Sequence, residues 1–252
     1  SGSFKWNNIT WVYNYESKTL TISGEGDMPT SEVPWKGLLQ NTYERNQDYV
    51  NYIVIDDGIT SIAANAFSAD NTIKGIVIGN TVKTIGANAF NCTATTFISN
   101  GATINQQIGS GAFSNLKSSC KVQYVPVNTN FYNLIKGTTS IIETLNSNGY
   151  IEIKSAQEWF DKIIIKAENN TPIIGRYQIA NNFNFSGNFT YKDEHRYKDK
   201  YQFHDTKIKY LDYFPDYIKE IRNDLGSKGD TYGMDQYKIV FIGTLDGDGY
   251  TI

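Results

Sequence analysis

The sequence predicts an α+β repeat protein, in which a short solenoid of stacked units is followed by a smaller α+β unit. Residues 53–67 recur as residues 76–90, and a looser copy ends at Phe113. The steps from Phe67 to Phe90 and from Phe90 to Phe113 are both 23 residues. Four turn-forming residues, 146–149, then mark a change of pattern. A fixed period of this length indicates a stack of similar supersecondary units.

Each unit carries apolar side chains that it cannot bury alone. The triplets at 53–55 and 76–78 are both Ile-Val-Ile, which suits a short strand. A later Ile and an Ala-Phe pair complete the unit, and neighbours in register can bury them as ladders. Burial of one such side chain contributes about 1.5–3 kcal/mol. The third copy is looser, since 17 residues run from Phe97 to Phe113 where 15 run from Ile53 to Phe67.

These residues resemble the BspA-like leucine-rich repeat of bacterial surface proteins. The resemblance rests on the pattern I-x-I-x-x-x-(I/V)-x-x-I-(G/A)-x-x-A-F, with Cys92 two residues after Phe90, and it covers roughly residues 4–145. It implies a leucine-rich-repeat domain over residues 1–148 and an extracellular or cell-surface location.

Both ends of the predicted repeat domain look like caps. Residues 9–15 and 19–23 alternate apolar and polar side chains, which predicts a hairpin. With Trp11 and Trp35 it would cover the open face of the first unit, as a cap over about residues 4–50. Residues 38–52 are a candidate short helix. At the other end, a strand from Lys121, a helix at 128–135 and a strand at 140–145 predict a C-terminal cap over about residues 121–145.

The second predicted domain spans residues 149–252. A strand at 150–154 precedes Ser155 and Glu158, which form a capping box for an amphipathic helix. Residues 150–187 and 239–252 resemble the opening of GLUG-associated, β-helix-like surface regions. Asn181 begins a stretch that replaces the acidic residues usual in that pattern. An insertion at about 188–238, with a helix expected at 215–225, separates the two matching pieces. Because a β-helix needs several stacked rungs, the natural protein is expected to continue beyond Ile252.

Composition argues against several classes of function. A net charge of −3 does not suit a nucleic-acid-binding surface. No run of 18 apolar residues is present, so membrane insertion is not expected. Two histidines and two cysteines are too few to predict a metal site, and no cofactor motif occurs. Cys92 and Cys120 are interpreted as buried core residues, with a disulfide as the alternative. The segment Asp246–Gly249 is interpreted as a turn rather than a calcium loop.

The predicted function is a non-enzymatic extracellular binding or adhesion module. The strand triplets would present a regular sheet face to a host or bacterial surface protein or a glycan, and the module is expected to be a monomer. The candidate contact residues are Tyr52 and Lys74 and, in the insertion, Tyr191, His195, Arg196, Tyr197 and Tyr201. One alternative is the non-catalytic N-terminal part of a secreted polysaccharide-active or peptidase β-helix enzyme with catalytic residues beyond residue 252. Another is a structural spacer.

Overall fold

The computed structural model describes residues 3–39, 49–68, 72–164, 172–183, 189–190, 207–208 and 241–249. Contacts divide the chain into two compact units. Unit 1 comprises residues 1–151 together with Ile174–Arg176, and unit 2 comprises residues 152–173 and 177–252. Among the described residues, no helix has the length and apolar character needed to cross a membrane.

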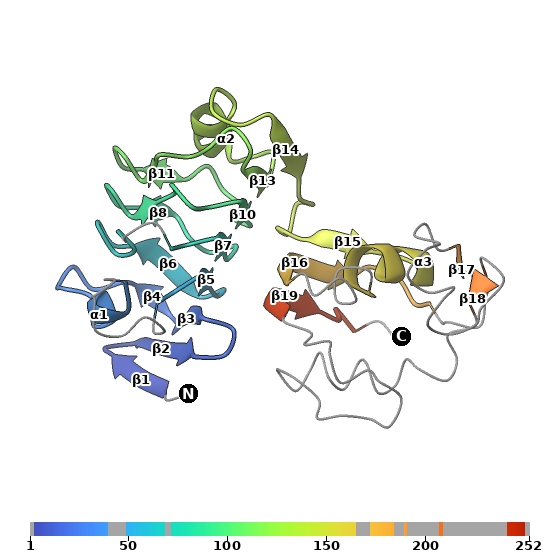
Figure 1. Ribbon diagram of the computed structural model, residues 1–252, viewed down its shortest axis with the longest axis horizontal. Helices are drawn as coiled ribbons and strands as arrows, with labels where there is room; N and C mark the ends of the chain where they lie inside the picture. The colour runs from blue at the N-terminus through green and yellow to red at the C-terminus, as the bar shows by residue number, and fades with distance from the viewer. Residues whose placement is uncertain are drawn as a thin grey trace. The chain divides into compact units, whose positions relative to one another are not determined.

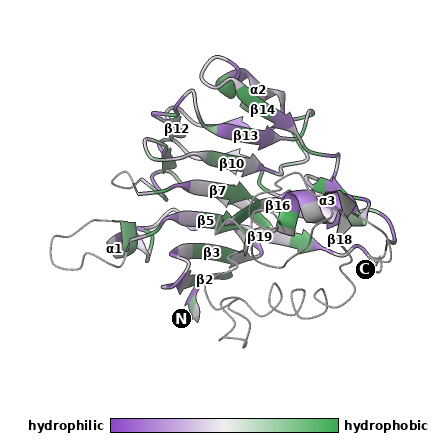
Figure 2. Cartoon of the chain, turned by 45° about the vertical axis from the view of Figure 1, so that its right-hand side comes forward, coloured by the Kyte–Doolittle hydropathy of each residue, from purple (hydrophilic) through white to green (hydrophobic). Residues whose placement is uncertain are grey.

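An eight-stranded sheet, the main sheet, organises unit 1 (Figures 1 and 2). It begins with an antiparallel part in which β2 pairs with both β1 and β3, and all later strands are parallel. The predicted hairpin is confirmed as β2 and β3, whereas the edge strand β1 was not predicted. In sheet order the strands are β1 (Ser3–Trp6), β2 (Ile9–Asn14), β3 (Thr19–Gly24), β5 (Tyr52–Ile55), β7 (Gly75–Ile78), β10 (Phe97–Asn100), β13 (Lys121–Tyr124) and β14 (Ile141–Thr144).

Two smaller parallel sheets complete the repeats. One has the order β11-β8-β6-β4 and the other pairs β12 with β9. Their strands are β4 (Gly26–Asp27), β6 (Ile59–Ile62), β8 (Thr84–Ile85), β9 (Phe90–Asn91), β11 (Gln107–Ile108) and β12 (Phe113–Ser114). Each repeat therefore contributes one strand to the main sheet and returns through short segments that pair with the neighbouring repeat. The repeat fold predicted from the sequence is confirmed.

A row of stacked aromatic rings runs through the core of unit 1. Phe67, Phe90 and Phe113 follow one another with ring centroids 5.2 Å apart and planes within 18° of parallel. Trp35 continues the row on Phe67 at 5.4 Å, and Phe131 meets Phe113 edge-on at 5.4 Å. The ladder of Phe on Phe expected from the sequence is confirmed, and it extends to residues on both sides of the repeats.

One backbone conformation recurs at the turn of each repeat. Asn65, Asn88 and Gly111 all have positive φ, between 53° and 68°. This left-handed conformation is tolerated by Asn and Gly because a larger side chain would crowd the following carbonyl. The conformation explains why an Asn stands before each Ala-Phe pair in the first two repeats and a Gly in the third.

The third repeat departs from the pattern because it buries a polar network. Asn100 pairs in register with Ile78 on the core side of the sheet. Its amide donates to Gln106 Oε1 at 2.7 Å, and Asn128 donates to the same oxygen at 2.9 Å. Gln106 in turn donates to the Val82 carbonyl at 2.9 Å. All three amide side chains are fully buried, so their hydrogen bonds replace an apolar contact here.

The helices of unit 1 are short. α2 (Thr129–Ile135) begins after Asn128, whose side chain accepts from the Phe131 N–H, and it buries Phe131 and Ile135 as predicted. α1 spans only Lys36–Leu39, so the helix expected from residue 38 begins earlier. The rest of that segment, residues 40–48, lies outside the described residues.

The two cysteines are buried and free. Burial is the largest cause that raises the pKa of both Cys92 and Cys120 to about 12. They are therefore neutral thiols at physiological pH, and the interpretation as core residues is confirmed.

Unit 2 contains a three-stranded sheet of order β15-β16-β19. One half of the predicted capping box is confirmed, because Ser155 Oγ accepts from the Glu158 N–H at 3.2 Å. The reciprocal bond is shifted by one residue, since Glu158 accepts from the Lys154 N–H at 2.7 Å rather than from that of Ser155. The elements are β15 (Ile151–Ile153), α3 (Ala156–Trp159), a π-helical turn (Phe160–Ile164), β16 (Ile173–Ile179), β17 (Phe189–Thr190), β18 (Lys207–Ile208) and β19 (Phe241–Asp246). The helix expected at 215–225 lies outside the described residues, and the β-helix resemblance stays a prediction.

Candidate functional site on the outer face of the main sheet

Side chains of the parallel strands alternate between the core and an outer face. Inward residues such as Ile53, Ile76, Ile98 and Val122 belong to the hydrophobic core. In register order, the outer face carries Tyr52 and Val54 on β5, Gly75 and Val77 on β7, Phe97 and Ser99 on β10, Lys121 and Gln123 on β13, and Ile141 and Glu143 on β14.

The outer face is not open along its whole length. Val54 and Val77 lie on it and are 4% and 0% exposed, although they are not part of the main core. Ile174 belongs to unit 1, and its Cδ1 lies 3.4 Å from the position that a Cβ on Gly75 would take. We call Ile174–Arg176 the strap. The expectation of a uniformly presented face is therefore wrong at its centre.

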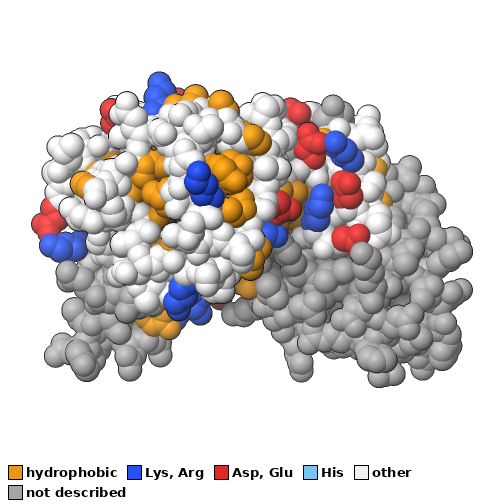
Figure 3. Space-filling model, turned by 90° about the horizontal axis from the view of Figure 1, so that it is seen from above, with side chains coloured by type: hydrophobic (Ala, Val, Ile, Leu, Met, Phe, Trp, Pro, Cys, Tyr) orange, Lys and Arg blue, Asp and Glu red, His pale blue; other side chains and the backbone are white. Residues whose placement is uncertain are grey.

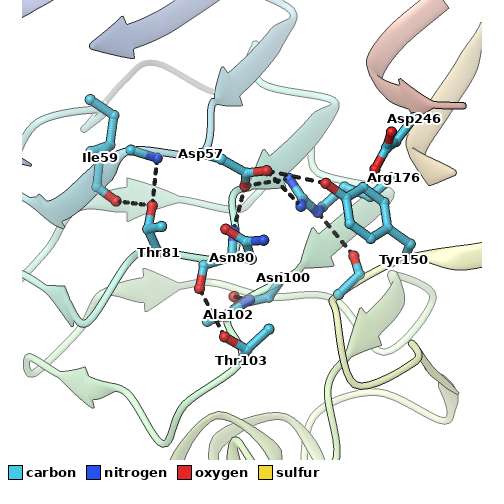
Figure 4. Close-up of polar contacts among 12 residues, drawn as sticks. Asp57, Ile59, Asn80, Thr81, Asn100, Ala102, Thr103, Tyr150, Arg176 and Asp246 are labelled. Carbon is cyan, nitrogen blue, oxygen red and sulfur yellow. Dashed lines mark hydrogen bonds and ion pairs between the residues drawn. The ribbon is translucent and has the colours of Figure 1, made fainter. Parts of the chain in front are cut away.

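A buried arginine fixes the strap. Arg176 is 1% exposed, and its guanidinium lies 3.0 Å and 3.2 Å from the two carboxylate oxygens of Asp57 (Figure 4). Its Nε donates to the Gly149 carbonyl at 2.9 Å. The guanidinium also lies 4.4 Å from the ring centroid of Tyr150, whose hydroxyl donates to Asp57 Oδ2 at 3.1 Å. Asp57 further accepts from the Asn80 N–H at 2.7 Å. This set, the Asp57–Arg176 latch, joins segments far apart in sequence.

Asp57 of the latch and the adjacent Asp56 have opposite pKa shifts. Burial would raise the pKa of Asp57, but the Arg176 guanidinium and the hydrogen bonds from Arg176, Asn80 and Tyr150 hold that pKa below its ordinary value. Burial, helped by the negative charge of Asp57, raises the pKa of Asp56 to about 6, and Arg176 opposes this shift. All three guanidinium nitrogens of Arg176 contact partners within the protein. The arrangement therefore suits a structural ion pair rather than a catalytic one.

The outer face is more open toward β14. Lys121 Nζ lies 3.1 Å from Glu143 Oε2, and these two side chains are 42% and 46% exposed. Gln123 Nε2 donates to the same carboxylate oxygen at 2.8 Å. Phe97, directly opposite Lys121 in register, is partly exposed. A polar and aromatic strip of one face therefore remains accessible at its edge.

Beside this strip, two buried polar atoms of the same face have no hydrogen-bond partner in the described part of the chain. They are Ser99 Oγ and Gln123 Oε1, on residues that are 0% and 3% exposed. The two residues are direct partners in the β10–β13 register. Buried polar atoms are normally paired, so these two atoms mark a place where a donor is needed. Sequence reasoning missed them because neither residue type is distinctive by itself.

The candidates named from the sequence fall into two groups. Tyr52 lies on the outer face with its ring against Gly75, and burial raises its pKa. Lys74 is exposed and directly precedes Gly75, so the structure brings these two candidates together. The remaining candidates, Tyr191, His195, Arg196, Tyr197 and Tyr201, lie outside the described residues.

A second feature lies at the end of unit 1 that carries α2 and β14. Tyr124 and Tyr132 stack at 5.3 Å, and Lys136 Nζ lies 5.9 Å from the Tyr132 ring centroid. Val127, Tyr132 and Ile141 are 51%, 38% and 45% exposed. Figure 3 looks onto this end and shows hydrophobic side chains gathered around a basic one. Exposed apolar side chains of this kind are common on protein surfaces. Substitutions in this patch are therefore used below as controls for substitutions on the outer face.

No metal or calcium chemistry is indicated in the described part of the chain. There, no group of three or more His, Cys, Asp or Glu side chains is placed to hold a metal ion. At the end of β19, the Asp248 N–H donates to Asp246 Oδ1 at 2.9 Å, and Asp248 and Gly249 both have positive φ. The interpretation of Asp246–Gly249 as a turn is confirmed.

Part of the chain matches a known family of repeats. The family described as BspA type leucine rich repeat region matches residues 40–157 in six copies, a little under half of the chain. No curated protein matches the chain. One similar solved structure is a leucine-rich repeat protein from Eubacterium ventriosum, with 18% identity and a TM-score of 0.30. The match covers 73% of this chain and 40% of that protein.

A further similar structure is a leucine rich cell surface protein from Faecalibacterium prausnitzii, with 14% identity and a TM-score of 0.26. The match covers 76% of this chain and 57% of that protein. The chain thus spans less than two thirds of the length of either protein.

Proposed function

We propose that this protein is a non-enzymatic binding module of a bacterial cell surface, and that it binds a protein or a glycan through the outer face of its main sheet. The observation that carries the proposal is the division of this face. Its centre is closed by the strap, whereas Phe97, Lys121 and Glu143 remain accessible on neighbouring strands. A rigid repeat scaffold holds these side chains at fixed spacing, which favours recognition over chemistry.

The chemistry of the described groups supports a binding role. The Asp57 carboxylate, just after β5, is occupied by Arg176, Tyr150 and Asn80. Lys121 and Glu143 neutralise one another, so the accessible strip has no net charge. The matched repeat family and the bacterial surface setting implied by the sequence resemblance support an extracellular location, and a monomer suffices for this mode of binding.

The proposal is tested by screening the purified chain on arrays of host proteins, bacterial surface proteins and glycans. We expect binding to at least one probe, and we expect Phe97→Ala combined with Lys121→Ala to weaken that binding. The matched control combines Tyr132→Ala with Val127→Ala, in the patch at the end of unit 1 that carries α2 and β14. This control should leave binding unchanged. Absence of binding to every probe, or equal loss with the control pair, would contradict the proposal.

A further inference from the structure

We infer that the ligand of the outer face is a neutral oligosaccharide, held at a site formed by Phe97, Ser99, Lys121, Gln123 and Glu143. This inference rests on the proposed function, because it names the class of ligand for the same face. The five residues lie on three neighbouring strands, β10, β13 and β14, and all belong to unit 1.

The first argument is the pair of unsatisfied atoms at the floor of this site. Gln123 Oε1 can only accept a hydrogen bond, whereas Ser99 Oγ can both donate and accept. Neither has a partner, although both atoms are buried. Their residues lie opposite each other on adjacent strands, which stand about 4.8 Å apart. Two neighbouring hydroxyl groups of a sugar ring carry the donors and acceptors that this floor requires.

The second argument is the surroundings of the floor. Lys121 and Glu143 are half exposed and form an ion pair on β13 and β14. The floor atoms are closed to solvent, so binding requires these two side chains to swing aside, and they then offer a donor and an acceptor to further hydroxyl groups. Gln123 already donates to Glu143 Oε2 at 2.8 Å, which orients its free carbonyl oxygen. The charges cancel within the site, and this favours an uncharged ligand over an anionic or cationic one.

The third argument separates a glycan from a peptide strand. β10 lies between β7 and β13, and β13 lies between β10 and β14, so their backbone hydrogen bonds are used within the sheet. An extended peptide could not pair with them. At this end of the sheet it could pair only with β14, the last strand of the sheet order, one strand away from Gln123 and two from Ser99. Phe97 is partly exposed beside Lys121, and an aromatic ring of this kind supplies an apolar surface against which a sugar ring can pack.

The experiment uses the full chain and an array of neutral, sialylated and sulfated oligosaccharides beside a protein array, followed by calorimetric titration of the neutral glycan that binds best. We expect Ser99→Ala to weaken this binding about 3–10-fold, as loss of one hydrogen bond does. Since Ser99 Oγ has no protein partner, Ser99→Ala should leave the melting temperature unchanged or raise it. Gln123→Leu should weaken binding further. Tyr132→Ala is the control and should leave binding unchanged.

The outcomes distinguish this inference from the proposed function. Neutral glycan binding that is weakened by Ser99→Ala and Gln123→Leu supports both. Binding to proteins alone, or to charged glycans alone, overturns the glycan inference and leaves the proposed function standing. Neutral glycan binding that neither variant affects overturns the assigned site. A chain that binds nothing on either array overturns both.

Discussion

Arg176 donates a hydrogen bond to Asp57 Oδ2 and forms an ion pair with Asp57 Oδ1, although the two residues are 119 positions apart in the chain. The two partners differ in their access to water, because the side chain of Arg176 is 1% exposed and that of Asp57 is 38% exposed. This asymmetry determines which partner is more costly to remove.

We expect Asp57→Asn to destabilise the fold more than Arg176→Met. The first variant leaves a buried guanidinium without its carboxylate, with only the neighbouring Asp56 as a compensating charge, and should cost about 2–4 kcal/mol. The second leaves Asp57 in contact with water, the Asn80 N–H and the Tyr150 hydroxyl, and should cost less than half as much. Urea denaturation of both variants measures the two costs. The reverse order would show that the latch contributes through packing alone.

Asp56 should make stability depend on pH. Its pKa is about 6 in the folded protein, against the ordinary aspartate value of 3.8 that applies to the unfolded chain. The folded state therefore binds the proton more tightly than the unfolded state. The free energy of unfolding should therefore rise as pH falls from 7.5 to about 4.5, by about 2 kcal/mol from this group.

The variant Asp56→Asn tests this pH dependence. It should be more stable than the parent at pH 7.5 and close to it at pH 4.5, because the uncharged amide removes the cost of a buried carboxylate. The measurement is urea denaturation at both pH values. An equal effect at the two pH values would refute the role assigned to the Asp56 charge.

The stacked rings should be sensitive to truncation. Phe90 is fully buried between Phe67 and Phe113, with centroids 5.2 Å from both. We expect Phe90→Ala to cost about 3–5 kcal/mol through lost burial and an unfilled cavity. Val127→Ala, at a side chain that is 51% exposed, is the control and should change stability by less than about 0.5 kcal/mol. Thermal or chemical denaturation compares the two variants.

The buried amide network should behave non-additively. Gln106→Leu leaves the amides of Asn100 and Asn128 without their shared acceptor, and should cost about 2–4 kcal/mol. Adding Asn100→Ile gives this strand the residue found at the paired position 78 and should recover part of the loss. If the double variant loses more free energy of unfolding than the two single variants lose together, the network is not the reason for the loss.

The repeats could be predicted from the sequence because one short pattern fixes many contacts at once. Phe67 and Phe90 recur at equal intervals, and equal intervals in a stack place equal side chains on top of each other. The helix that buries Phe131 and the capping box of Ser155 followed from local rules of the same kind.

The latch and the floor of the candidate site could not be predicted in this way. In the sequence Asp57 is simply one of two adjacent acids, and no periodicity relates it to Arg176. Ser99 and Gln123 acquire significance only from the register that places them opposite each other. In the sequence the third repeat is only looser than the first two, whereas the fold shows that Asn100 and Gln106 replace apolar packing there by hydrogen bonds. Long-range pairs of single residues leave no pattern in the sequence.

The latch also determines how the molecule should respond to mechanical tension. Pulling on the two termini would transmit load from residue 57 directly to residue 176, so the intervening repeats would be shielded until the guanidinium and the carboxylate separate. We therefore expect a tethered protein to lengthen first outside this closed loop, and the repeats to extend only at a higher force.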